Sequence, residues 1–95
     1  MTDTTFTIRH ASAADADAVA RLAALDSASP PKGELLLAEV GPELWAAVEI
    51  DSGKAIADPF RPSGDLVELL HFRAARMRLE VAKPSRRLSL LPRAA

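Results

Sequence analysis

The chain has 95 residues, 48% of them hydrophobic, and a formal charge of −1, a balance that fits one small globular domain. It contains no cysteine, which excludes disulfides, cysteine zinc sites and cysteine nucleophiles, and its two histidines argue against a metal centre. No apolar run approaches the roughly 20 residues of a membrane span. The polar start MTDTTF differs from a signal peptide, so we expect a cytoplasmic protein.

Charge is distributed unevenly along the chain. Residues 1–70 contain five Lys and Arg against twelve Asp and Glu, whereas residues 71–95 contain seven against one. The basic end could bind an anionic partner, or it could dock on its own acidic body or on a neighbouring copy. Its arginines could equally remain solvated, and the sequence leaves these alternatives open.

The first two predicted elements are a strand and a helix. Residues 4–10 alternate between apolar and polar side chains, which predicts a strand with Phe6 and Ile8 on one well-buried face. Ser12 then predicts a helix start, because its side chain can accept from the backbone amide three residues on. The helix should end near residue 25, since two prolines in the following loop prevent its continuation. Its apolar stripe is formed by Val19, Leu22 and Leu25.

Three further strands, joined by tight turns, follow that proline-containing loop. Alternating apolar positions predict strands over residues 34–40, 43–51 and 54–58, with Gly41 and Gly53 in the turns. The first two of these strands are apolar on both faces in places, which predicts a sheet covered from both sides. Strict alternation in the second of them assigns one face to Leu44, Ala46, Val48 and Ile50, and the other to Trp45 and Ala47.

The last predicted element is a helix. Ser63 is expected to cap its start, and an apolar stripe extends from there to about Leu79. Pro84 is expected to end it, which leaves residues 80–95 as a basic, mobile tail after a single domain of residues 1–79. The fold class is therefore α+β, in the order β-α-β-β-β-α. We expect a mostly antiparallel four-stranded sheet with one helix on each face.

The opening of the chain carries a resemblance to a known family. The sequence IRHASAADA, residues 8–16, looks like the start of the GNAT acetyltransferases, whose first strand often ends in Ile-Arg-x-Ala before an Asp-containing helix start. The order of the later strands and the last helix is also similar to that family. The resemblance covers roughly residues 5–79, which correspond to the N-terminal half of a GNAT domain.

The resemblance also identifies a candidate cofactor loop. In GNAT proteins the pattern Gln/Arg-x-x-Gly-x-Gly/Ala, before the helix that follows the fourth strand, holds the acetyl-CoA pyrophosphate on backbone amides. Here RPSGDL, residues 61–66, stands at that place, which implies Arg61, Ser63 and Gly64 as cofactor-binding residues. Its proline removes an amide donor, a leucine replaces the final Gly or Ala, and Asp65 adds a negative charge where phosphates would lie. A cap at Ser63 with Asp65 beside the helix dipole accounts for the same residues, so we expect no cofactor.

No residue is assigned a catalytic role. The sequence contains no tyrosine, so the general acid that the family often uses to protonate the thiolate is missing. Glu49 and Asp58 are candidates for a carboxylate base by strand position, but a base would need burial to raise its pKa. Such carboxylates are more often solvated groups at a sheet edge. His10 and His71 have no Ser or Asp arrangement beside them, which favours surface or partly buried histidines.

Two functions from different classes follow. The first is a shortened, non-catalytic GNAT-like domain that acts as an interaction or assembly module. The strand from Lys54 to Asp58 would be an open sheet edge, so we expect a homodimer or a protein partner to pair with it. The alternative is a minimal N-acetyltransferase or acyl-CoA-binding protein, with acetyl-CoA as cofactor, that completes its cleft by dimerising. A membrane is not an expected partner, and an acidic body without a recognition helix argues against nucleic acid.

Overall fold

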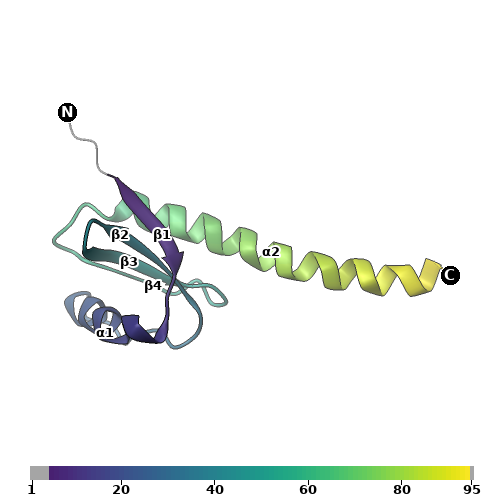
Figure 1. Cartoon of the computed structure of the whole chain (residues 1–95), viewed down its shortest axis with the longest axis horizontal. Coiled ribbons are helices and arrows are strands. Elements are labelled where there is room, and N and C mark those ends of the chain that lie inside the picture. Colours follow the sequence, from purple (N-terminus) through teal and green to yellow (C-terminus); the bar gives the residue numbers. More distant parts are fainter. Residues whose placement is uncertain (1–4, 95) are drawn as a thin grey trace.

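A computed structural model describes the backbone of residues 5–94 and the side chains of residues 5–80. Its four strands form one antiparallel sheet in the order β1-β2-β3-β4, so that neighbours in the sheet are also neighbours in the sequence (Figure 1). The predicted α+β class is confirmed. The elements in chain order are β1 (Phe6–His10), a short 3-10 helix η1 (Ala13–Asp15), α1 (Ala16–Leu25), β2 (Leu35–Val40), β3 (Glu43–Glu49), β4 (Ala55–Ala57) and α2 (Gly64–Ala94).

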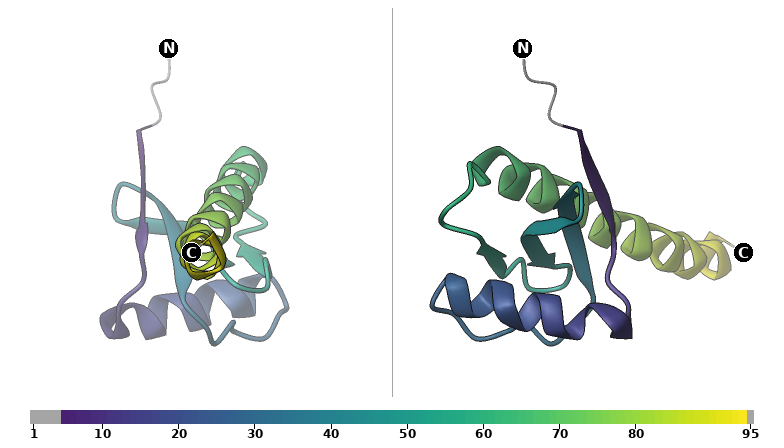
Figure 2. Two further views of the ribbon diagram at one scale, coloured as in Figure 1. Left: turned by 90° about the vertical axis from the view of Figure 1, so that its right-hand side faces the viewer. Right: turned by 60° about the vertical axis from the view of Figure 1, so that its left-hand side comes forward.

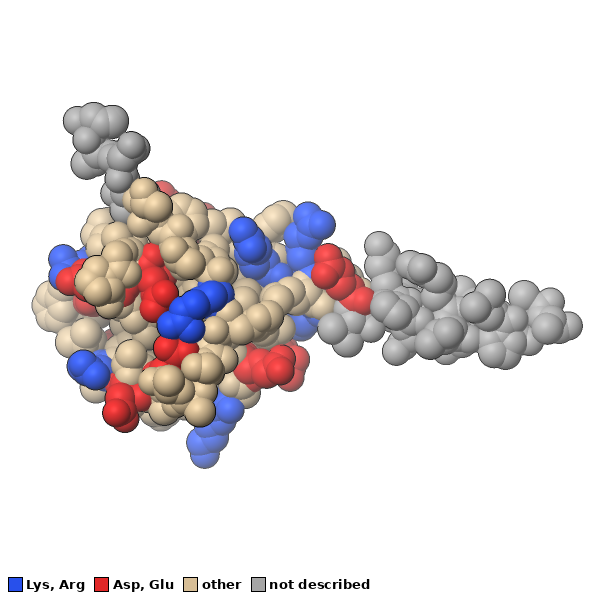
Figure 3. Space-filling view, viewed as in Figure 1, with Lys and Arg blue, Asp and Glu red and all other residues tan. Residues whose placement is uncertain are grey.

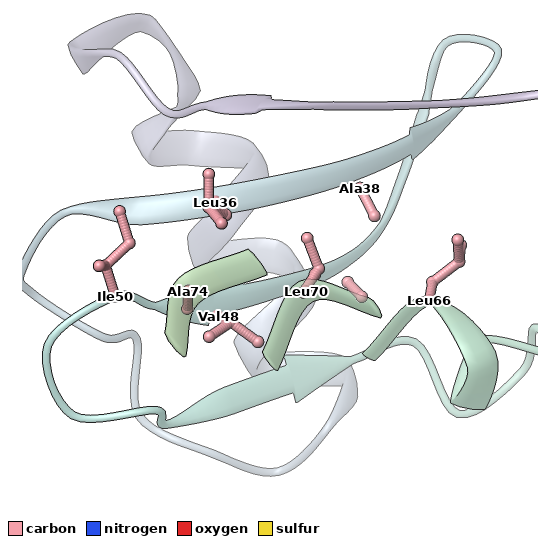
Figure 4. Close-up of a cluster of buried hydrophobic side chains, with 8 residues drawn as sticks. Leu36, Ala38, Val48, Ile50, Leu66, Leu70 and Ala74 are labelled. Atoms are coloured by element: carbon pink, nitrogen blue, oxygen red, sulfur yellow. The ribbon is translucent and has the colours of Figure 1, made fainter. Parts of the chain in front are cut away.

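The two helices cover opposite faces of the sheet (Figure 2), as predicted. Alternating side chains of β2 and β3 enter both of the resulting cores, because both faces of these strands are apolar. The core under α1 consists of Val19, Leu22, Ala23, Leu35, Leu37, Ala47 and Ile56. The core under α2, shown in Figure 4, consists of Leu36, Ala38, Ala46, Val48, Ile50, Leu66, Leu70 and Ala74.

The start of α1 agrees with the predicted pattern in part. The Asp15 carboxylate accepts the N–H of Ser12 at 2.7 Å, which satisfies a backbone donor ahead of the helix. The first turn is the 3-10 helix η1, and α1 proper begins after it. Val19 and Leu22 are buried as expected, whereas Leu25, the last residue of α1, is 45% exposed and does not complete the stripe.

A β-bulge in β3 changes which side chains face each helix. The pairing with β2 joins Ala46 to Ala38 and Leu44 to the residue after it, so Trp45 is an extra residue without a partner on β2. This shifts the alternation by one position. Leu44 therefore packs on the α1 side and Trp45 on the α2 side. The predicted faces of these two residues are wrong, because strict alternation holds only as far as a bulge.

Helix α2 begins where it was predicted, but its start is held differently. The C=O of Ser63 accepts the N–H of Val67 at 3.0 Å, which places Ser63 at the N-cap position. Its hydroxyl donates to the C=O of Asp58 at 3.2 Å. The side chain of Ser63 thus anchors the helix start to the chain just after β4, in place of the predicted bond to a helix amide.

The predicted end of α2 near Leu79 is too early. The helix extends to Ala94, passes Pro84 and continues beyond the sheet (Figure 1). A proline costs one backbone hydrogen bond, but the Leu, Arg and Lys residues around it favour the helical state. The side chains of residues 81–95 lie outside the described part of the chain, so the mobile basic tail over residues 80–95 stays a prediction.

Two leucines of α2 provide a test of this packing. Leu70 is 0% exposed and Leu79 is 60% exposed. We expect Leu70→Ala to lower the free energy of unfolding by about 2–5 kcal/mol, because it removes buried methyl groups and leaves a cavity. The matched Leu79→Ala should change it by less than about 0.5 kcal/mol. Urea denaturation followed by circular dichroism measures both, and equal losses would contradict the described burial.

Candidate interaction edge

Strand β1 forms one outer edge of the sheet, and its register decides which backbone groups face outward. The N–H of Ala11 donates to the C=O of Leu35 at 3.0 Å, in the same register as the pairs of β1 with β2. In an antiparallel pair the bonded positions alternate. Thr7 and Arg9 therefore turn their N–H and C=O groups toward β2. The residues with backbone groups facing away from the sheet are Phe6, Ile8 and His10.

Among the described residues, no strand pairs with this outer edge. The outward groups receive one hydrogen bond from these residues, which the Arg9 side chain donates to the C=O of His10 at 3.1 Å. Helix α2 packs mainly on β2, β3 and β4, and near β1 its Met77 and Arg78 line a pocket together with His10. Ile8 is half-buried, and Phe6 is 42% exposed. The prediction of a well-buried face on this strand is therefore wrong for Phe6.

The edge is held in place by charged side chains on the α1 face. Two nitrogens of the Arg9 guanidinium donate to the Asp15 carboxylate, at 2.8 and 2.9 Å. Two also donate to the Glu39 carboxylate, each at 3.0 Å. Hydrogen bonds with Asp15 and then Glu39 raise the pKa of Arg9. The Arg9 guanidinium and the N–H of Ser12 together hold the pKa of the Asp15 carboxyl well below its ordinary value. This network joins β1 to β2 and to the start of α1.

The opposite edge, β4, is shorter and partly blocked. It has three residues against five in β1. By the same alternation Ala55 and Ala57 face outward, and the N–H of Ala57 donates to the Asp26 carboxylate at 3.1 Å. The sequence predicted an open edge over Lys54 to Asp58. Asp26, from the end of α1, protects part of it.

A groove borders β1 on the α2 side. It has a volume of about 390 Å³, and its lining is Leu36, Phe72, Arg73, Arg76, Met77 and Glu80. Phe72 is 59% exposed, and the guanidinium of Arg76 lies 5.9 Å from the centre of its ring. Figure 3, seen from the side of β1, shows positive and negative side chains interspersed with uncharged ones on this face. This face therefore presents apolar area together with charges of both signs, and neither sign of charge dominates it.

The three predicted cofactor residues lie in or beside the β4–α2 loop. Arg61 forms an ion pair with Glu43 at 2.9 Å, and its guanidinium lies 5.7 Å from the centre of the Trp45 ring. Trp45 Nε1 also donates to Glu43, at 3.0 Å. The guanidinium that would meet a phosphate is thus paired with a carboxylate of β3.

The other two predicted residues differ in their surroundings. Ser63 is buried, and its hydroxyl donates a hydrogen bond to the C=O of Asp58. Gly64 is exposed, with open space where a side chain would stand. Asp65 lies in the first turn of α2, as the alternative interpretation of a capped helix start requires.

The two candidate bases are carboxylates that accept hydrogen bonds from neighbouring groups. Glu49 accepts from the Ser52 hydroxyl and from the N–H of Gly33, and these bonds lower its pKa, the opposite of what a general base at neutral pH needs. Asp58 accepts the N–H of Phe60 at 2.8 Å within a turn. His10 and His71 are both exposed. In the described part of the chain no group of three or more acidic or His side chains could hold a metal ion.

Comparisons of the chain with known protein families, curated proteins and solved structures found no match. The resemblance to the GNAT family therefore stays a prediction. Within the described residues, no helix has the length and apolar character to cross a membrane.

The Asp15–Arg9 contact predicts how stability depends on pH. Because the folded-state pKa of Asp15 lies below its unfolded value of about 3.9, its contribution is complete above that value and is lost as pH falls through the folded pKa. We expect the free energy of unfolding to decline below about pH 4, and less steeply in Asp15→Asn. Asp17→Asn, at an exposed position two residues further along, is the control. Urea titrations between about pH 2 and pH 7 measure this, and identical slopes would contradict it.

Proposed function

We propose that this domain is a protein-interaction module that accepts an extended strand on the free edge of β1. The observation that carries the proposal is the outward row of N–H and C=O groups at Phe6, Ile8 and His10, on the outermost strand of the described sheet. Such a row is a template for strand addition, in which main-chain hydrogen bonds supply affinity and alternate side chains supply specificity. Phe6 offers the largest exposed apolar side chain on this edge.

Natural edges usually carry a protection, and β1 lacks the common ones. Within Phe6–His10 there is no lysine, no proline and no bulge, and its arginine is engaged on the α1 face by Asp15 and Glu39. The β4 edge, which the sequence suggested as the partner site, is shortened and bound by Asp26. Strand β1 is therefore a better site for strand addition than the strand around Lys54.

The edge is also ordered before any partner arrives. The bonds of Arg9 to Asp15 and Glu39 fix β1 on the sheet, so less conformational entropy is lost on pairing. Each backbone hydrogen bond contributes about 1 kcal/mol net, against several kcal/mol for association. A strand alone therefore supports weak, reversible pairing, and neighbouring apolar contacts would have to strengthen it.

Hydrogen exchange tests this proposal through the alternation of β1. On addition of a synthetic strand peptide of alternating Thr and Val, we expect slower exchange at the amides of Phe6, Ile8 and His10. The amides of Thr7 and Arg9 already face β2 and should change little. Two-dimensional NMR on the full chain measures each amide separately. Protection at Ala55 alone would assign the interaction to β4, and no protection on either edge would contradict the module.

The acyl-CoA alternative predicts a different measurement. Arg61 is paired with Glu43 and a carboxylate stands at Asp65, so we expect no saturable heat when acetyl-CoA at millimolar concentration is titrated into the full chain. Micromolar binding that Gly64→Glu weakens would support the cofactor loop instead. Glu68→Gln, a change at an exposed position one turn further along α2, is the control for an unspecific charge effect.

A further inference from the structure

We propose that the strand added to β1 is β1 of a second copy, in an antiparallel pair with a two-fold axis beside Ile8. This inference rests on the proposed function and names its partner. The joined sheet would have the order β4-β3-β2-β1-β1-β2-β3-β4, and it would leave no free edge at the junction.

The outward groups of β1 are symmetric about Ile8. If the two Ile8 residues face each other as a bonded pair, Phe6 of each copy faces His10 of the other. All three outward residues of both strands then exchange N–H···O=C bonds, roughly six in total. A shift by two residues in either direction leaves one of the three outward positions on each strand without a partner among Phe6–His10. The arrangement centred on Ile8 is therefore the one that satisfies the strand completely.

The side chains fit this register on both faces of the junction. On the α2 face, the half-buried Ile8 side chains would lie side by side, and Phe6 would lie against the imidazole of His10. On the α1 face, Thr7 would face Arg9 of the second copy. Each arginine already contacts two carboxylates of its own chain, and no two like charges stand directly opposite each other.

The helices leave room for the pairing. Helix α2 makes its main contacts with β2, β3 and β4, and in the left view of Figure 2 it lies beside β1 without crossing it. A two-fold axis perpendicular to the sheet keeps both copies of α2 on the same face. The exposed side chain of Phe6 and the half-buried side chain of Ile8 would then join their counterparts, so apolar area adds to the backbone bonds.

The first experiment measures mass in solution. Sedimentation equilibrium of the full chain, from roughly 1 µM to 1 mM, should show a monomer–dimer equilibrium. Phe6→Lys places a charge on the edge and should weaken the dimer at least tenfold. Leu25→Lys, at a similarly exposed apolar position on α1, should leave it unchanged, and the urea midpoints of both variants check that each is folded.

Outcomes of this experiment separate the two proposals. A strict monomer at 1 mM overturns the second copy as partner, and the strand-peptide exchange experiment then decides whether the module itself survives. A dimer that Phe6→Lys does not weaken overturns the β1 junction, because the contact then lies on another surface.

The second experiment tests the register. The chain has no cysteine, so single cysteines can be introduced without competing thiols. A mixture of Phe6→Cys and His10→Cys chains, treated with a short bismaleimide, should give mostly the mixed cross-linked dimer. Each variant alone should cross-link poorly, because equivalent positions would lie four residues apart along the strands, about 13 Å. Efficient cross-linking of Phe6→Cys with itself would overturn the register centred on Ile8.

Discussion

The constraint on which the structure depends is the apolar character of β2 and β3 on both of their faces. Leu36 and Val48 point to one side while Leu37 and Ala47 point to the other, and all four are buried. A sheet of this kind is stable only with cover on both sides. The two helices supply that cover, and a small domain without disulfides has little other means to exclude water from its core.

The position of the helices decides the character of the sheet edges. Helix α1 packs on β3 and β4, and α2 packs on β2, β3 and β4, so the cover that the helices provide is weakest along β1. At β4 the deficit is small, because the strand is short and Asp26 binds an outward N–H. At β1 it is larger, since three of its five residues turn their backbone groups outward and the side chain of Phe6 is exposed. The candidate interaction edge is thus a direct consequence of how the core is covered.

Electrostatic contacts hold the loops and edges that packing does not. The pairs of Arg9 with Asp15 and Glu39 connect the start of α1 to β1 and β2, and the pair of Arg61 with Glu43 connects the β4–α2 loop to β3. Pairs that are partly exposed contribute modestly to stability. Their larger effect is positional, because each fixes a side chain that would otherwise be available to a ligand or partner. This is the reason that Arg61 is a poor candidate for holding a phosphate.

The sequence by itself determined the element order, the strand alternation and the two-sided core, because residue spacing along the chain encodes which side chains share a face. It did not determine the place of Trp45, since a bulge adds one residue without any marking in the local pattern. It also could not show that Phe6 is exposed, that Asp26 reaches Ala57, or that Arg61 meets Glu43. The sequence of β1, which has no proline or lysine, is typical of an unprotected edge. Only the position of α2 in the structure shows that this edge is the more open of the two. Contacts between residues distant in the chain depend on how elements pack, and that arrangement exists only in the tertiary structure.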